Sequence, residues 1–174
     1  DKSTLDINGA RARLDSWMAV DFGTSAGELH YSGMTPRIIC ERFLSDVSGG
    51  QPIDYKVFCF SGRVHCTLVC QERGRNRRPV FDLYDREWRK RLQYRKSSMG
   101  SDREVPRPES LTDMILISEA LSRPFPFVRV DFYDFEGNAI LGEMTFTPNV
   151  CINRDYTDEA QRLFGDLIIL PTRI

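Results

Sequence analysis

Two alternating stretches in the C-terminal half of the chain decide its fold. Residues 127–133 read FVRVDFY and residues 139–146 read AILGEMTF, with the turn-forming sequence EGN at 136–138 between them. Alternation of apolar and polar residues with a period of two is typical of strands, and a short break that contains glycine is typical of a hairpin turn. The two stretches therefore predict an antiparallel hairpin.

A three-residue loop at 136–138 would place Asp131 opposite Glu143. The same register places Arg129 opposite Thr145, on the same polar face. Two carboxylates that lie opposite each other repel, and a hard cation such as Mg²⁺ would relieve that repulsion, while an arginine can hold phosphate or carboxylate with two hydrogen bonds. Two alternatives stay open: the face is ordinary solvated surface, or a two-residue turn breaks the pairing.

The other elements follow from periodicity and turn residues. Three helices are predicted, over about residues 7–18, 110–123 and 158–164. A buried strand is predicted over 37–44 (RIICERFL), and a second hairpin is predicted over 56–60 and 63–70, around the turn Ser61-Gly62. This order of elements predicts an α+β fold, in which helices flank an antiparallel sheet.

Composition excludes several classes of protein. The chain has 174 residues and a formal net charge of -1, which suits one globular domain, or part of a larger one, that needs no disulfide or metal to fold. No apolar run approaches the roughly 20 residues of a membrane helix, so no membrane span is predicted, and the near-zero charge argues against bulk attraction to nucleic acid. Five cysteines, mostly in apolar runs, predict reduced thiols and a cytoplasmic location.

Residues 71–107 stand out by their charge. They hold 12 of the 24 basic side chains and only six acidic ones, and their glycines and prolines predict an exposed, partly mobile insertion. We expect this insertion to attract an acidic acceptor, such as a uronic-acid polymer or a glutamate chain, with Arg75, Arg77 and Arg78 among its cations. A nucleic-acid patch is the alternative, but interspersed acids and the lack of a nucleic-acid motif disfavour it.

Four blocks in the sequence together resemble the TupA-like ATP-grasp family, which is associated with teichuronopeptide and other surface-polysaccharide biosynthesis. The resemblance spans about Trp17 to Pro171, and its blocks are RIICERFL at 37–44, DYKVFCFSG at 54–62, FPFVRVDFY at 125–133 and GEMTFTP at 142–148. It implies an ATP- and Mg²⁺-dependent ligase that activates a carboxylate as an acyl phosphate before an amine attacks. A non-catalytic nucleotide-binding module associated with a glycosyltransferase is the alternative.

The resemblance also implies roles for single residues. Around adenine, Glu41 would bind the amino group and the backbone of Arg42 and Leu44 would bind the edge of the base. Asp54 would bind the ribose hydroxyls, and Lys56 would reach a phosphate. Asp131 and Glu143 match the metal-binding acids of the family and Arg129 matches its cation beside the transferred phosphoryl group, and Asn149 is a further candidate metal ligand.

The chain departs from the general ATP-grasp pattern at three places. Thr145 stands where the usual pattern has Asn, although the TupA-like branch also carries Thr there. The sequence after Pro148 lacks the usual small, glycine-rich residues, which puts the shape of the acceptor pocket in doubt. Residues 1–36 contain no glycine-rich phosphate loop, so we expect residues 1–36 to be a remnant of the N-terminal ATP-grasp subdomain and residues 37–174 to be the C-terminal subdomain, with the N-terminal part of the fold missing.

One rival motif is a G-x-S-x-G sequence at 23–27, the pattern that surrounds the nucleophile of many serine hydrolases. That serine must sit between a strand and a helix, and the sequence after Gly27 does not predict a helix start. The two histidines, His30 and His65, have no further ligand at metal-binding spacing, so we expect His65 to be structural.

Overall fold

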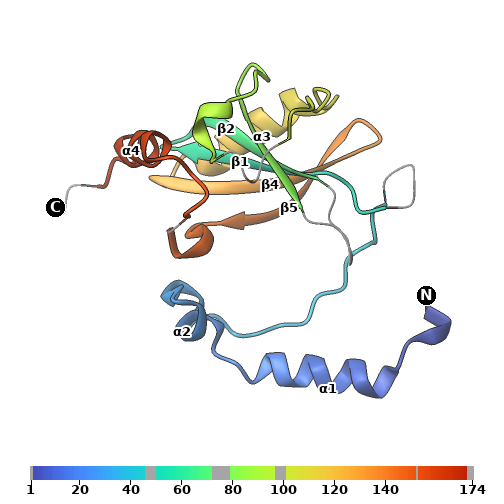
Figure 1. The fold of residues 1–174 in the computed structure, drawn as a ribbon. Coiled ribbons are helices and arrows are strands. Elements are labelled where there is room, and N and C mark those ends of the chain that lie inside the picture. The colour runs from blue at the N-terminus through green and yellow to red at the C-terminus, as the bar shows by residue number, and fades with distance from the viewer. Residues whose placement is uncertain (1, 46–49, 72–78, 97–100, 152, 172–174) are drawn as a thin grey trace. The chain divides into compact units, whose positions relative to one another are not determined.

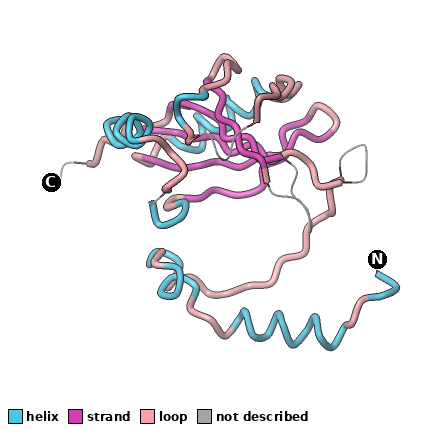
Figure 2. Tube along the Cα trace, in the orientation of Figure 1, coloured by secondary structure: helices cyan, strands magenta, loops and turns pink. Residues whose placement is uncertain are grey.

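The computed structural model describes residues 2–45, 50–71, 79–96, 101–151 and 153–171. Its chain divides into two compact units, Asp1–Phe43 and Leu44–Ile174. Each unit has its own local structure and is described by itself (Figures 1 and 2).

The C-terminal unit is built on one five-stranded sheet with the strand order β3-β2-β1-β4-β5, in which every neighbouring pair is antiparallel (Figure 1). Its strands are β1 (Asp54–Phe60), β2 (Arg63–Gln71), β3 (Val80–Asp85), β4 (Phe127–Phe135) and β5 (Asn138–Thr145). Two helices, α3 (Leu111–Ser122) and α4 (Asp158–Asp166), accompany the sheet. The α+β fold with an antiparallel sheet is confirmed.

Side-chain alternation gives the sheet two apolar faces, and each helix covers one of them. Met114 of α3 packs in a core cluster with Val57 and Val130. Phe164 of α4 packs in a second cluster with Phe58, which follows Val57 in β1 and so points the other way. Because α4 covers only part of its face, the remainder of that face is available to polar side chains.

The hairpin of β1 and β2 forms as predicted. Ser61 and Gly62 occupy the two turn positions with φ of 47° and 81°, the left-handed values that a two-residue type I′ turn needs. The helix predicted from Ser110 also forms as α3 and ends before Pro124.

The hairpin of β4 and β5 differs from the prediction at its turn. The loop has two residues, Glu136 and Gly137, and not three, so Phe135 pairs with Asn138. A β-bulge then adds one residue to β5, because Phe132 pairs with Leu141 while Asp131 pairs with Glu143 and Gly142 is left over. The short turn and the bulge compensate each other, and the predicted pairing is present.

Residues 80–96, which fall in the insertion that we expected to be exposed, are partly buried in the sheet. They contain the edge strand β3 and the short 3-10 helix η3 (Leu92–Tyr94), and Leu83 and Tyr84 are buried. The short apolar run VFDLY at 80–84 is consistent with a strand, but the charged residues around it concealed this pattern. Arg75, Arg77 and Arg78 lie outside the described residues.

The N-terminal unit contains α1 (Ile7–Met18), α2 (Phe22–Ala26) and the 3-10 helices η1 (Lys2–Thr4) and η2 (Leu29–Tyr31). Asp6 caps α1 by accepting a hydrogen bond from the backbone N–H of Gly9, as predicted for a helix over 7–18. Ser25 lies inside α2, not at a strand-to-helix turn, so the serine-hydrolase reading has no support.

The strand predicted over 37–44 is wrong. The structure describes this segment as loop, drawn in pink in Figure 2, and Ile39 and Phe43 are exposed. A β-branched run forms a strand only where another strand offers it backbone hydrogen bonds, and the described sheet ends at β3 and β5 without pairing to this segment.

None of the helices in the described part of the chain has the length and apolar character needed to cross a membrane.

Candidate functional site

Charged side chains from three adjacent strands, β1, β4 and β5, meet on the part of this sheet face that α4 does not cover. β1 contributes Asp54 and Lys56, and the antiparallel register of β1 and β4 places Lys56 beside Asp131. The register of β4 and β5 then adds Glu143 beside Asp131 and Thr145 beside Arg129. We call these six residues the acid–base cluster: Asp54, Lys56, Arg129, Asp131, Glu143 and Thr145.

Lys56 lies between two aspartates. Its Nζ is 2.7 Å from Oδ2 of Asp54 and 2.6 Å from Oδ2 of Asp131, and both carboxylates are almost fully buried. Burial alone would lower the pKa of Lys56, but the negative charge and hydrogen bonds of the two aspartates outweigh it and raise the pKa. Lys56 is therefore a permanently charged group that holds β1 to β4.

Arg129 forms a second ion pair with Asp131. Its Nε and Nη2 donate to Oδ1 and Oδ2 of Asp131 at 2.7 and 2.8 Å, which is a bidentate pair. Nη2 also donates to Oγ1 of Thr145 at 3.1 Å and to Oε1 of Glu143 at 3.3 Å. Burial opposes the charge of Arg129, yet Asp131 and Glu143 keep its pKa above the usual value.

The two paired carboxylates differ in environment. Asp131 is 3% exposed and held by two cations, whereas the side chain of Glu143 is 63% exposed. Partial burial and the nearby charge of Asp131 raise the pKa of Glu143. This is the electrostatic repulsion that the predicted register implied.

The cluster fits one mode of Mg²⁺ binding. Its oxygen donors are the hard ligands that Mg²⁺ prefers. In the part of the chain that the structure describes, no three acidic, histidine or cysteine side chains gather closely enough to hold a metal ion by themselves. Mg²⁺ is commonly bound by one or two carboxylates together with substrate phosphates, and Asp131 with Glu143 fits that arrangement.

The remaining predicted residues are not part of the cluster. Glu41 and Arg42 belong to the N-terminal unit and are exposed, and Leu44 begins the C-terminal unit. Asn149 lies in the 3-10 helix η4 (Pro148–Cys151), is exposed and has a φ of 51°. The roles that the resemblance implies for these residues stay predictions.

A cavity of about 220 Å³ adjoins the cluster on the same face of the sheet. Arg129 lines it, together with Asn149 and residues of β1, β4 and α4. Sequence reasoning missed this cavity, because it depends on where α4 lies on the sheet, which local periodicity does not specify. The available signal was the row of aromatic residues on the cluster's own strands, at positions 58, 60 and 127.

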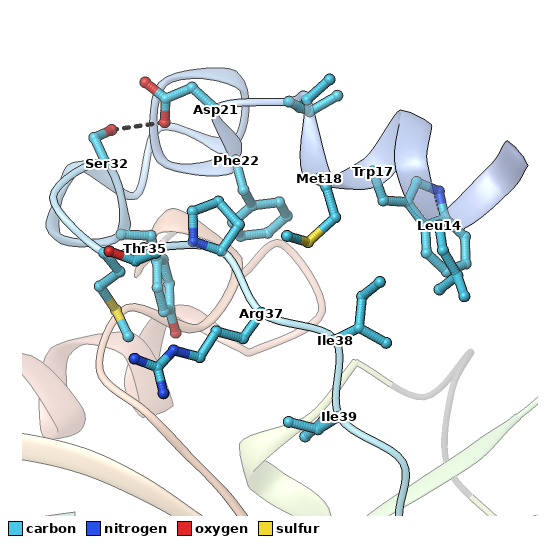
Figure 3. Close-up of a pocket in the computed structure, with 15 residues that line it drawn as sticks. Leu14, Trp17, Met18, Asp21, Phe22, Ser32, Thr35, Arg37, Ile38 and Ile39 are labelled. Atoms are coloured by element: carbon cyan, nitrogen blue, oxygen red, sulfur yellow. Dashed lines mark hydrogen bonds between the residues drawn. The ribbon is translucent and has the colours of Figure 1, made fainter. Parts of the chain in front are cut away.

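The N-terminal unit has a hollow of its own, of about 1040 Å³. Figure 3 shows that Leu14, Trp17 and Met18 of α1 line it together with Ile38 and Ile39. Of its polar residues, Ser32 donates through Oγ to Oδ1 of Asp21 at 2.9 Å, and Thr35 and Arg37 line it as well. Most of the residues labelled around the hollow are apolar.

His65 is structural, as expected. Its ring is 6.1 Å from that of Tyr94 in a stacked arrangement and meets Phe60 and Phe164 edge to face. Burial, with the positive charge of Arg91, lowers the pKa of His65. Cys59, Cys66 and Cys70 are buried thiols that form no disulfide, as predicted, and Cys40 is an exposed thiol.

The α+β arrangement with an antiparallel sheet, and the acids and cations on one face of that sheet, are what the sequence resemblance leads one to expect of an ATP-grasp-like protein. The sequence model described as TupA-like ATPgrasp matches residues 1–169, nearly the whole chain. The chain therefore belongs to the TupA-like ATP-grasp family, and the resemblance seen in its sequence is confirmed. Membership indicates a nucleotide-binding, ligase-type enzyme. Comparison with curated proteins found no match, and comparison with solved structures found none either.

Proposed function

We propose that this chain provides the metal- and phosphate-binding part of an ATP- and Mg²⁺-dependent carboxylate–amine ligase. Its pathway would be the biosynthesis of a cell-surface polysaccharide, polyglutamate or teichuronopeptide, in the cytoplasm, where ATP is available. The observation that carries the proposal is the acid–base cluster, because three carboxylates and two permanently charged cations on one sheet face suit the binding of a triphosphate and its metal.

Asp131 and Glu143 would hold Mg²⁺, with Asn149 as a further candidate ligand. When bound, the ion neutralises phosphate charge and polarises the γ-phosphoryl group. Arg129 fixes the carboxylate of Asp131 with two hydrogen bonds, so the direction of that metal ligand is set before any ligand arrives.

Lys56 and Arg129 would bind the oxygens of the phosphates. Lys56 now has two aspartate partners, and a phosphate oxygen can replace one of them without leaving the ammonium group unpaired. Arg129 would stabilise the negative charge that develops as the γ-phosphoryl group leaves ADP, and this electrostatic support would lower the barrier.

The reaction has two steps in this proposal. An oxygen of the carboxylate substrate attacks the γ-phosphorus, and the bond to ADP breaks, which forms an acyl phosphate. The amine then attacks the acyl carbon, and phosphate leaves with the amide bond formed. Glu41, Arg42, Leu44 and Asp54 would bind the adenine and ribose in the roles that the family resemblance implies.

ADP release tests the proposed chemistry. ADP should form only when ATP, Mg²⁺, a carboxylate and an amine are all present, and Arg129→Met should reduce the rate at least about a hundredfold, as the loss of a charge-stabilising donor does elsewhere. ADP release that is independent of carboxylate and amine would contradict a ligase.

One observation favours the alternative, a nucleotide-binding module without catalysis that is associated with a glycosyltransferase. Both oxygens of Asp131 already accept hydrogen bonds from cations of the protein, so this carboxylate is compensated without a metal. Nucleotide binding with no ADP release under any combination of substrates would support this module and contradict the ligase.

A further inference from the structure

The cavity beside Arg129 has an aromatic interior. Phe58 and Phe60 of β1 and Phe127 of β4 line it from the sheet, and Tyr156 and Phe164 line it from the α4 side. These rings pack against one another with centroids 5.1 to 6.4 Å apart. Because the rings pack against one another, they form a rigid apolar wall on one side of the cavity. Such a wall favours a ligand with a flat apolar body.

Arg129 is the one charged residue in the described lining of this cavity. Its Nε and Nη2 donate to the cluster, and the hydrogen bonds found among the described residues leave Nη1 unused. A guanidinium whose Nη1 makes none of these bonds, in the lining of an apolar cavity, is suited to an anionic group such as a carboxylate.

Two amide side chains add polar groups at the rim. Gln161 donates through Nε2 to the backbone oxygen of Tyr156, and Asn153 accepts the backbone N–H of Asp155 through Oδ1. Within the described chain these bonds leave the Oε1 of Gln161 and the Nδ2 of Asn153 for a ligand. Gln161, Gly165 and Ile168 recur at helical spacing, so one side of α4 and the turn after it forms this rim.

We propose that the cavity is the binding site for the carboxylate substrate, and that this substrate is a small carboxylic acid with a flat apolar body, such as an aromatic acid. Its carboxylate would pair with Nη1 of Arg129 and its body would lie on the aromatic wall. This inference rests on the proposed function, because it takes the bound acid to be the group that the ligase activates.

The size and lining of the cavity separate this class from others. At about 220 Å³ it is smaller than the cavities that hold drug-sized ligands, so it suits a single small unit of substrate and not a polymer segment. Glutamate and uronic acids carry polar groups all around, and those groups would lose their hydration against phenylalanine rings. An acidic polymer would have to be bound elsewhere.

The experiment titrates four probes into the ¹⁵N-labelled full chain without nucleotide and follows the amide signals of Phe127 and Gly165. Benzoate should bind with a Kd at least tenfold lower than benzyl alcohol, which lacks the charge, and at least tenfold lower than acetate, which lacks the apolar body. L-glutamate should bind no better than acetate. Equal affinity for benzoate and benzyl alcohol, or for benzoate and glutamate, would overturn the inference.

Gly165 allows the cavity to be closed without disturbing the cluster. A Cβ atom at this position meets no atom within 4 Å, so Gly165→Leu can add a side chain toward the cavity. We expect Gly165→Leu to weaken benzoate binding at least tenfold and the matched Gly165→Ala variant to retain it. Unchanged benzoate affinity in Gly165→Leu would place the ligand elsewhere and overturn the inference.

Adenosine and ATP distinguish this inference from the proposed function. Adenosine should not displace benzoate, and displacement would show that the cavity takes the nucleotide base. Mg²⁺-dependent ATP binding should be the same in Gly165→Leu and Gly165→Ala. If ATP does not bind while benzoate does, the ligase proposal fails and the carboxylate site stands, whereas the reverse result removes the carboxylate site alone.

Discussion

Lys56 is the residue on which the acid–base cluster depends most. It lies between two aspartates that are 4% and 6% exposed, and their mutual repulsion would be uncompensated without it. We expect Lys56→Met to reduce the free energy of unfolding by about 3 kcal/mol, the usual effect of breaking a buried ion pair. Denaturant unfolding followed by circular dichroism measures this.

Arg86→Met is the matched control for Lys56→Met. Arg86 pairs with Glu119, but both side chains are partly exposed, and exposed pairs contribute less than about 1 kcal/mol. A loss in Lys56→Met no larger than that in Arg86→Met would show that the cluster does not hold the strands together.

His65 should make stability depend on pH. Burial, with the charge of Arg91, lowers the folded-state pKa of His65 below the usual 6.5, so the unfolded chain takes up a proton first as the pH falls. Stability is therefore complete above about pH 6.5 and declines from there down to the lowered pKa. His65→Phe keeps the aromatic contacts but cannot take up a proton. Its melting temperature should therefore depend less on pH over this window.

A comparison at pH 8 is the control for His65→Phe. His65 is neutral in both states there, so any difference between variant and parent reflects the ring replacement alone. If the melting temperature of the variant falls as steeply as that of the parent between pH 6.5 and 5, another group carries the dependence.

At the scale of elements, the turn at Ser61-Gly62 sets the register of the first hairpin. Gly62 has a φ of 81°, and a Cβ there would lie 3.3 Å from the backbone Cα of Arg123. We expect Gly62→Ala to destabilise the protein by about 1 to 2 kcal/mol, because an L side chain is strained in this conformation. Thermal or denaturant unfolding of the variant measures the loss.

Gly165→Ala is the counterpart of Gly62→Ala. Gly165 lies in α4, and a Cβ atom added there would meet no atom within 4 Å, while alanine in a helix is more stable than glycine by up to about 1 kcal/mol. The two glycine-to-alanine changes should thus have opposite signs. A stabilising Gly62→Ala would show that the turn does not have the described conformation.

Much of the sheet could be predicted from the sequence, because alternation marks β4 and β5, and the turn Ser61-Gly62 between two apolar stretches marks β1 and β2. The pairing of Asp131 with Glu143 was predicted for an incomplete reason. The loop is one residue shorter than expected, and the bulge at Gly142 restores the register. The isolated glycine inside this strand pattern was the local sign of a bulge, but the register argument did not use it.

Long-range pairing limited the rest of the prediction. Lys56 and Asp131 are 75 residues apart in sequence, and they are in contact only because β1 and β4 pair in the sheet. The segment 37–44 shows the opposite failure, since its apolar and β-branched residues predicted a strand and the described structure gives it no partner. Family resemblance supplied the joint assignment that local patterns did not.

At the scale of the whole molecule, the two units differ in how their apolar residues are used. The C-terminal unit buries two apolar clusters, whereas α1 has no buried residue and Trp17 is 64% exposed. A helix of 12 residues is marginal in water without packing. We therefore expect α1 to be only marginally stable by itself.

Hydrogen exchange of the free chain tests this contrast. We expect the amides of α1 to exchange with protection factors below about 10, while those of β1 and β4 approach the protection set by global unfolding. The strands serve as the internal control in the same sample. Protection of α1 equal to that of β4 would show that its apolar side is covered in solution.

The central claim, that the acid–base cluster binds ATP with Mg²⁺, is tested most directly by calorimetric titration of ATP with and without Mg²⁺. The comparison is between the parent chain, an Asp131→Asn, Glu143→Gln variant and an Asp113→Asn, Glu109→Gln variant with the same change of net charge, all checked for folding by thermal unfolding. We expect Mg²⁺-dependent binding in the parent and the charge control, and its loss in the cluster variant. Equal binding in all three proteins, or none in the parent, would contradict the claim.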